Sequence, residues 1–339
     1  MSRGLKLAVV GATGLVGQEI IKTLKQRDLE VNDIKFYASA RSAGKRITFN
    51  RKGYSVEDIK DADFKSVDLA LFSAGSEVSK EYAPIAKKAG CVVIDNSSAW
   101  RMDKDVPLVV PEVNPKDINN GKGIIANPNC STIQLVVALK PLHDFAKIER
   151  IVVTTFQAVS GTGQNAVDEL KRQIREYSDH EDMIANVYPH RIAFNALPHI
   201  DEFLENGSTK EEEKMVKETQ KILDKKIKVS ATAVRVPVFT GHSESVNIVT
   251  KEKITPAKAR ELLEKFPGVK VIDEPDENKY PLPIFSEGTD ACFVGRIRSD
   301  DSVENGLNMW IVADNLRKGA ALNTVQLAEL AVKEKLAGN

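Results

Sequence analysis

The sequence predicts an α/β protein with two domains: a doubly wound, mostly parallel sheet at the N-terminus, then an α+β domain with a mostly antiparallel sheet. In residues 1–127 short apolar strands alternate with helical segments, a pattern typical of parallel strands joined by crossover helices. Residues 128–314 contain strands rich in β-branched residues together with charged amphipathic helices. Residues 315–339 end in an amphipathic helix, which we expect to return to the first domain.

Each element is predicted from its own hydrophobic period. In the first domain we expect a helix at 14–27 and strands at 6–12, 34–40, 67–75 and 91–98. In the second domain alternation predicts strands at 150–161, 228–238, 243–250 and 291–298. Helical period predicts further helices at 131–142, 168–177, 209–226 and 318–336.

Charge and composition favour a small-molecule partner. The chain has 48 Lys and Arg against 48 Asp and Glu, so no net field attracts nucleic acid or an anionic membrane. No apolar run reaches the roughly 18 residues that span a bilayer, and the start MSRGLKLAVVGATG leads directly into a strand, so we expect a cytoplasmic protein. Three widely spaced cysteines fit neither a disulfide framework nor a zinc site, and no metal is expected.

The segment GATGLVG places Gly11, Gly14 and Gly17 between a strand and a helix. Glycines there allow a tight turn and a close approach to a pyrophosphate, which the free N–H groups of the helix start attract. This predicts a Rossmann-like dinucleotide site. The spacing is GxxGxxG rather than GxGxxG, so a glycine-rich turn without a ligand is the alternative.

The end of the second predicted strand favours NADP over NAD. An NAD site usually offers an acidic residue to the ribose there, whereas this chain has ASARSAGKR. Arg41, with Ser39 and Ser42, is suited to hold a 2′-phosphate through charge-assisted hydrogen bonds. The alternative is that Arg41 and Lys45 are solvated loop charges.

Cys130, in ANPNCST, is the candidate nucleophile. The apolar period after it predicts a helix that Ser131 or Thr132 can cap, which places the sulfur near a helix N-terminus and favours the thiolate. A buried structural role is the alternative. That role suits Cys91 and Cys292, which we expect in strand interiors.

His242 is the candidate partner base. It follows Gly241 in a turn just before a strand, and Arg235 is expected near the same strand end. A lone loop histidine is more often structural, which is the alternative here. The remaining histidines are expected late in a helix (His143), in an acidic surface run (His180) and in a packed or hydrogen-bonded role beside an apolar segment (His190 and His199).

Taken together the motifs resemble one family. GATGLVG, NPNCST, QAVSGTG, KMVKET, RVPVFTGHSES and ADNLRKGAA occur in the order seen in the aspartate-β-semialdehyde dehydrogenase family, over essentially the whole chain. The resemblance implies NADPH-dependent reductive dephosphorylation of β-aspartyl phosphate to the semialdehyde and phosphate, in diaminopimelate, lysine, methionine and threonine biosynthesis. It also implies a homodimer, or a dimer of dimers, built through the second domain.

The resemblance also assigns roles by position. Cys130 is implied as the nucleophile that forms an acyl-thioester, His242 as general acid and base, and Gln157 as the residue that orients the substrate. The implied substrate-binding residues are Arg235 for the carboxylate, Arg101 and Lys214 for phosphate, and Glu211 for the amino group. The implied cofactor contacts are Gly11, Thr13, Gly14, Leu15, Val16, Ser73, Gly75, Ser160, Gly161 and Asn315. Without the family, the charges of residues 209–221 are a solvated helix face, and Gln157 is an ordinary strand residue.

Two competing interpretations remain. N-acetyl-glutamyl-phosphate reductase and the glyceraldehyde-phosphate dehydrogenases use the same thioester chemistry, but their cysteines resemble HPGCY and SCTTN rather than NPNCST. A non-catalytic NADP-binding sensor could keep the fold, although an intact set of Cys130, Gln157, Arg235 and His242 argues against it.

Overall fold

The computed structural model describes residues 4–338, and these form two compact units, each with its own sheet. The first unit combines residues up to Asn129 with those from Ala320 onward, and the second is Cys130–Gly319. The boundaries expected from the sequence were 127 and 314. Among the described residues no helix has the length and apolar character needed to cross a membrane.

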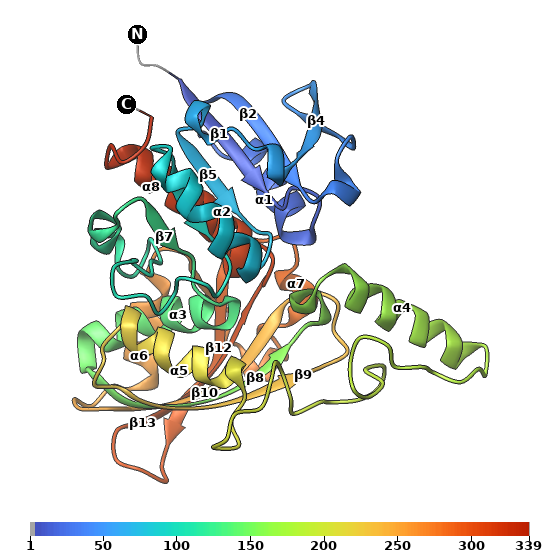
Figure 1. Cartoon of the computed structure of the whole chain (residues 1–339). Helices are drawn as coiled ribbons and strands as arrows, with labels where there is room; N and C mark the ends of the chain where they lie inside the picture. Colours follow the sequence, from blue (N-terminus) through green and yellow to red (C-terminus); the bar gives the residue numbers. More distant parts are fainter. Residues whose placement is uncertain (1–3, 339) are drawn as a thin grey trace. The chain divides into compact units, whose positions relative to one another are not determined.

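The first unit contains a seven-stranded sheet in the order β3-β4-β2-β1-β5-β6-β7; β4, β2, β1, β5 and β7 are labelled in Figure 1. All neighbours are parallel except β3 and β4, which form an antiparallel hairpin at one edge. The strands are β1 Leu5–Val10, β2 Val31–Ala38, β3 Arg46–Phe49, β4 Lys52–Asp58, β5 Leu69–Phe72, β6 Val92–Asp95 and β7 Ile124–Ala126. The predicted doubly wound, mostly parallel sheet is confirmed, and the hairpin was missed.

Helices cover both faces of this sheet. They are α1 Leu15–Gln26, α2 Ser76–Lys88 and α8 Leu322–Lys333. Leu7 and Val9 of β1 belong to the core with α1 and α8, whereas α2, which was not predicted, contacts β5 and β6. An ion pair joins α8 to the end of α1, with Arg27 Nε 2.6 Å from Glu329 Oε1.

The second unit contains a six-stranded sheet in the order β11-β12-β13-β10-β8-β9. The strands are β8 Ile148–Gln157, β9 Lys228–Arg235, β10 His242–Thr250, β11 Val269–Val271, β12 Cys292–Asp300 and β13 Gly306–Ala313. Three neighbouring pairs are antiparallel, while β8–β9 and β11–β12 are parallel. The predicted mostly antiparallel sheet is therefore confirmed, although β11 and β13 were not foreseen.

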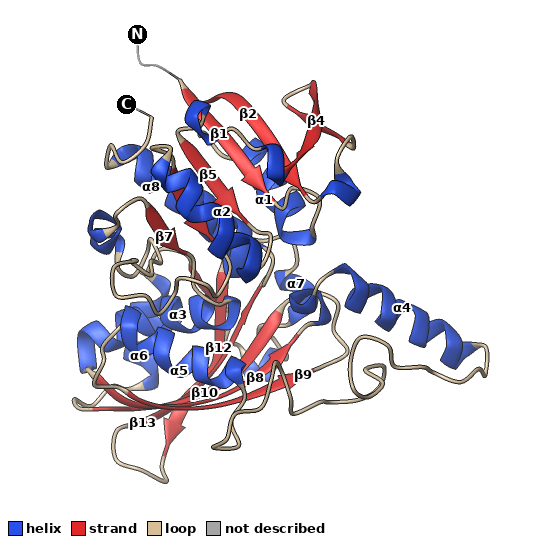
Figure 2. Ribbon diagram, in the orientation of Figure 1, coloured by secondary structure: helices blue, strands red, loops and turns tan. Residues whose placement is uncertain are grey.

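One face of the second sheet carries three of the helices of this unit (Figure 2), and the core lies on that face. The helices of this unit are α3 Cys130–Ala146, α4 Gln164–Ser178, α5 Lys210–Ile222, α6 Pro256–Glu264 and α7 Pro283–Ser286. Apolar residues of α3, α5 and α6 pack on inward-facing strand residues such as Val246 and Ile248. Phe156 and Trp310 lie on the opposite face, half-buried, with ring centroids 5.5 Å apart.

The register brings one group of polar residues to a single edge of this sheet. Gln157, the last residue of β8, pairs with Arg235, the last residue of β9. On the other side of β8, Phe156 pairs with Ser243, so His242 begins β10 beside the end of β8. The ends of β8 and β9 and the start of β10, far apart in the sequence, therefore lie together.

Candidate active site

Cys130 is the first residue of α3, so its sulfur lies at the helix N-terminus. The prediction that Ser131 or Thr132 caps this helix is wrong, because both lie inside its first turn and are buried. Asn129 precedes the first helical residue, a position at which Asn is favoured. The N–H groups and the dipole of a helix start stabilise a thiolate.

His242 is the side chain that meets this sulfur. Its Nε2 lies 3.2 Å from Cys130 Sγ, and the ring is fully buried. Its Nδ1 accepts a hydrogen bond from the backbone N–H of Ala158 at 3.0 Å. Because an N–H group only donates, Nδ1 carries no proton, and the neutral ring holds its proton on Nε2, toward the sulfur.

The imidazole is held in its neutral form. Burial, reinforced by the cation of Arg235, keeps the pKa of His242 well below its usual value. An imidazolium would also need a proton on Nδ1, where the Ala158 N–H points. His242 is therefore a neutral hydrogen-bond donor beside the thiol.

Arg235 lies beside the same backbone. Its Nη1 donates to the carbonyl of Ala158 at 2.6 Å, and the residue is 5% exposed. A Cβ at Gly161 would lie 3.1 Å from Arg235 Nη1 and 3.3 Å from His242 Cε1. A glycine at 161 thus leaves room between the guanidinium and the imidazole.

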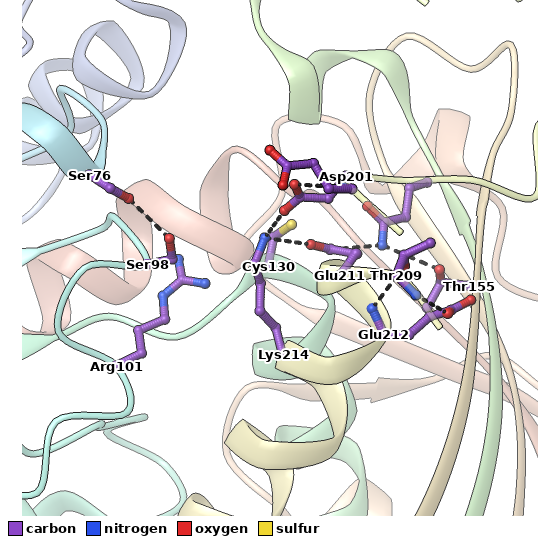
Figure 3. A network of polar contacts seen from close by, with 12 residues as sticks. Ser76, Ser98, Arg101, Cys130, Thr155, Asp201, Thr209, Glu211, Glu212 and Lys214 are labelled. Carbon is purple, nitrogen blue, oxygen red and sulfur yellow. Dashed lines mark hydrogen bonds and ion pairs between the residues drawn. The ribbon is translucent and has the colours of Figure 1, made fainter. Parts of the chain in front are cut away.

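A polar network leads from Gln157 to α5, and Figure 3 shows its members Glu211, Lys214 and Asp201. Gln157 Nε2 donates to Glu211 Oε1 at 3.1 Å, and Lys214 Nζ lies 3.2 Å from Glu211 Oε2 and 2.6 Å from Asp201 Oδ2. Glu211 is nearly buried, whereas the side chain of Lys214 is about one-quarter exposed at 25%. The charge run of α5 is therefore not a wholly solvated face.

Asn315 and Gly319 support the cysteine and histidine from the end of the second unit. Asn315 Oδ1 accepts from Gly241 N at 2.8 Å, and its Nδ2 donates to Ser160 Oγ at 2.9 Å. A Cβ at Gly319 would lie 2.8 Å from Cys130 Cβ, closer than side chains tolerate. The π-helical turn Arg317–Ala321 can therefore approach the cysteine only because it has glycine there.

The other cysteines and histidines lie in different settings. Cys292 begins β12 and Cys91 directly precedes β6, so the prediction that they lie in strand interiors is wrong. Both are buried as expected, and burial raises the pKa of Cys91 to about 12. His190 is exposed, so the packed form of its predicted role is wrong, while His199 stacks on Phe203. In residues 4–338 no three His, Cys, Asp or Glu are grouped as metal ligands.

In the first unit the glycine segment forms a tight turn between β1 and α1. Gly11 has φ +84°, and a Cβ there would lie 2.5 Å from the carbonyl oxygen of Ser73. A Cβ at Gly17 would lie 2.2 Å from the oxygen of Gly11. Gly14 is the N-cap of α1, which has no side-chain cap and no acidic residue in its first turn. The donors of a helix start beside a glycine cradle suit a pyrophosphate.

Residues around this turn include the other predicted cofactor contacts. Leu15 and Val16 open α1, and Thr13 Oγ1 donates to Ser42 Oγ at 3.2 Å. Arg41 lies in the short 3-10 helix Ala40–Ser42 and is exposed, as is Ser39. This segment brings a cation and two hydroxyls near the end of β2 with no acidic residue between 39 and 45.

Arg101 is also in the first unit, and its guanidinium is tied to backbone carbonyls. Nε donates to Asn127 O at 3.0 Å and Nη2 to Asn96 O at 2.7 Å. Gly75 takes φ +85° and caps α2 at the end of β5. Arg101 and the glycine turn thus belong to one unit, and the Cys130 edge belongs to the other.

Sequence reasoning missed two buried polar residues behind His242. Glu244 is fully buried in β10, and Gln134 is 1% exposed one turn after Cys130 in α3. Alternation could have found Glu244, because it falls in phase with the core residues Val246 and Ile248. No sequence signal distinguished Gln134.

A dinucleotide-type turn in one unit and a cysteine–imidazole pair at a helix start in the other define a class of dehydrogenase that works through a cysteine. Family models match both units: "Semialdehyde dehydrogenase, NAD binding domain" over residues 6–121 and "Semialdehyde dehydrogenase, dimerisation domain" over residues 139–318. The chain belongs to the aspartate-semialdehyde dehydrogenase family.

Relatives of that family match along their whole length. The chain is 59% identical to aspartate-semialdehyde dehydrogenase of Aquifex aeolicus, covering 98% of this chain and 99% of the relative. A solved structure of aspartate semialdehyde dehydrogenase II from Vibrio cholerae, complexed with ASA, is 47% identical with a TM-score of 0.96, covering 98% and 99%. The enzyme of Candida albicans with NADP is 27% identical with a TM-score of 0.78, covering 98% and 99%.

Proposed function

We propose that the protein is an aspartate-semialdehyde dehydrogenase that converts β-aspartyl phosphate and NADPH to aspartate β-semialdehyde, phosphate and NADP⁺. The observation that carries this proposal is the pairing of Cys130 Sγ with His242 Nε2 at 3.2 Å, at a helix start, in a chain of this family. The competing acyl-phosphate reductases are disfavoured by the 59% identity over the whole chain.

In the proposed reaction Cys130 attacks the acyl phosphate as a thiolate. A carbon–sulfur bond forms, the carbon–oxygen bond to phosphate breaks, and phosphate leaves with the electron pair. Hydride addition to the thioester carbon gives a tetrahedral oxyanion, and its collapse to the aldehyde expels the Cys130 thiolate again. The sulfur is thus regenerated in the form in which it began.

His242 is proposed to assist at its Nε2 atom, as the acid and base of the reaction. The neutral ring donates a hydrogen bond from its Nε2–H first to the thiolate and then to the carbonyl oxygen as negative charge develops there, and the proton stays on the ring. The Ala158 contact at Nδ1 supports the hydrogen-bond donor part of this role more than the formation of an imidazolium.

The remaining side chains are proposed to bind the charges of the substrate. Arg235 offers the planar fork that suits a carboxylate, and Gln157 offers a neutral amide beside it. Glu211 is suited to the ammonium group, with Lys214 three residues later on the same helix face for phosphate. Arg101 is proposed as the second phosphate ligand.

The cofactor is proposed to be NADP(H), which supplies the hydride. The cradle at Gly11, the uncapped start of α1 at Gly14 and the cation of Arg41 support this choice. Thr13, Leu15, Val16, Ser39, Ser42 and Ser73 are proposed as further contacts, with Ser160, Gly161 and Asn315 from the second unit.

The assembly is proposed to be a homodimer, alone or as half of a tetramer, in the cytoplasm. The matched dimerisation-domain model supports the dimer. The half-buried Phe156 and Trp310, on the sheet face opposite the helical core, are the surface we assign to it.

The test is phosphate-dependent reduction of NADP⁺ by aspartate semialdehyde. We expect turnover that requires both phosphate and the aldehyde, with N-acetyl-glutamate semialdehyde as the control substrate. Turnover with the control but not with aspartate semialdehyde would reject the substrate. Turnover of neither, in protein that binds NADPH, would favour a non-catalytic sensor.

A further inference from the structure

Glu244 is a buried carboxyl group for which the proposed reaction has no use. It is the third residue of β10, and it lies on the same face as His242 because strand side chains alternate. Its neighbours across the sheet are Thr155 and Ile311. The residue is fully buried, and neither of its carboxyl oxygens has a hydrogen-bond partner. A buried carboxylate without partners costs several kcal/mol, so this group needs an explanation.

Gln134, one turn after Cys130 in α3, also has a buried side-chain atom without a hydrogen bond. Its Nε2 donates to the backbone carbonyl of His242 at 3.4 Å, whereas its Oε1 has no partner. Burial raises the pKa of Glu244 well above its usual value, and the amide of Gln134 opposes that rise. The amide is therefore a polar group that faces the carboxyl, and burial favours the neutral form of that carboxyl over the charged form.

A neutral carboxyl group has the donor and the acceptor that would satisfy both residues. Its O–H can donate to Gln134 Oε1, and its carbonyl oxygen can accept one Nε2 hydrogen in return. The second Nε2 hydrogen stays on the His242 carbonyl. An ionised carboxylate has no donor and leaves Gln134 Oε1 without a hydrogen bond.

We propose that Glu244 is a positioning residue: as a neutral carboxylic acid it pairs with the Gln134 amide, which holds the backbone of His242 and thereby the imidazole against Cys130. The effect on turnover rests on the proposed function, whereas the effects on the carboxyl and on the thiol do not. Neutrality also matters, because a negative charge behind the histidine would oppose the Cys130 thiolate and favour an imidazolium.

The first experiment determines the charge of Glu244. Glu244→Gln keeps the size and the hydrogen bonds of a neutral acid. We expect its infrared difference spectrum at pH 7 to show loss of a protonated-carboxyl band. Glu169→Gln is the matched control, because Glu169 is also buried but accepts two backbone N–H groups, at 2.6 and 2.7 Å, as a carboxylate does. A spectrum in which Glu244→Gln loses only carboxylate absorption would overturn the proposal.

The second experiment follows Cys130 by the pH dependence of its alkylation with iodoacetamide. We expect the midpoint of Glu244→Gln to match wild type, since no charge is removed. Glu244→Leu, which loses the pair, should shift that midpoint and lower kcat about tenfold or more with little change in the KM for NADPH. A lower midpoint in Glu244→Gln would mean that a negative charge had been removed.

The remaining outcomes are also decisive. If Glu244→Leu folds and leaves both the alkylation profile and kcat unchanged, Glu244 is a space-filling group and the positioning role is wrong. If Glu244→Leu does not fold, Gln134→Leu gives the same test from the other partner. An enzyme inactive with aspartate semialdehyde but with the expected infrared and alkylation results would sink the proposed function and leave the neutral acid–amide pair in place.

Discussion

The two units place their functional groups at strand ends in different ways. In the first unit the turn after β1 is made of backbone: Gly11 and Gly17 remove side chains so that main-chain atoms come close. In the second unit the edge is made of side chains, with Cys130 and His242 brought together from positions 112 residues apart. A site made of main-chain atoms can be recognised from one short segment of the sequence. A site made of side chains from distant segments depends on the register of a sheet.

The largest effect is expected from replacing the sulfur, which tests whether reaction chemistry and cofactor binding belong to different units. Cys130→Ala should lower turnover by roughly 10⁴-fold or more, since a nucleophile has no substitute in the pair. NADPH binding, measured by fluorescence titration, should be unchanged because the proposed phosphate cradle belongs to the first unit. Residual activity near wild type, or a lost cofactor affinity, would mean that the two roles are not divided between the units in this way.

The imidazole should matter less than the sulfur. His242→Asn removes the donor at Nε2 and should lower kcat roughly 10²- to 10⁴-fold, with the folded state retained. Burst measurements of phosphate release will show which half-reaction slows. His180→Asn, an exposed histidine in the turn that follows α4, is the control and should behave as wild type. Equal rates for the two variants would remove His242 from the reaction.

Arg235 tests whether the proposed binding of the substrate carboxylate requires the planar guanidinium group or only a positive charge. Arg235→Lys keeps the cation but loses the planar fork, and we expect the KM for aspartate semialdehyde to rise about 10- to 100-fold. Arg298→Lys, on the exposed part of β12, is the matched control. A lysine variant with an unchanged KM would show that Arg235 acts only as a point charge.

Arg41 tests the proposed cofactor site of the first unit, where it is the candidate ligand of the 2′-phosphate. Arg41→Ala should raise the KM for NADPH about tenfold while that for NADH stays nearly constant, because only NADPH carries the 2′-phosphate. Lys45→Ala, from the same loop, is the control. An equal rise for both cofactors would place the phosphate contact at another residue.

Features formed by one short segment could be predicted from the sequence, whereas contacts between distant segments could not. The glycine turn and the alternation of strands were visible locally, so the type of each sheet was predicted correctly. The strands β3, β4, β7, β11 and β13 were missed, and the edge strands β3 and β11 carry little hydrophobic signal. The start of α3 was misplaced because Asn129, Ser131 and Thr132 are all residue types that cap helices. The network of Gln157 with Glu211 could not be foreseen from spacing, since β8 and α5 meet only in the fold.

The smallest expected effect concerns stability in acid. The folded protein keeps His242 neutral, whereas the unfolded chain protonates it below about pH 6.5, so this group's contribution is present above pH 6.5 and is lost as pH falls toward the folded pKa. Wild type should therefore lose more unfolding free energy than His242→Asn between pH 7 and pH 5. The difference should approach about 1.4 kcal/mol for each pH unit that the solution lies below the pKa of the unfolded chain, until the folded pKa is reached.

Glu244 changes the unfolding free energy with pH in the opposite direction to His242. The His242→Asn variant must therefore be compared with wild type at each pH. Its folded pKa is raised, so its contribution is full below about pH 4.5 and is lost as pH rises through the folded pKa. Subtracting the His242→Asn curve from wild type cancels the Glu244 contribution, because both proteins contain that residue. The unfolding free energy of each protein is measured by urea unfolding at each pH and fixed ionic strength. If the wild-type and His242→Asn curves run parallel from pH 7 to pH 5, the imidazole of His242 is as easily protonated in the folded protein as in the unfolded chain.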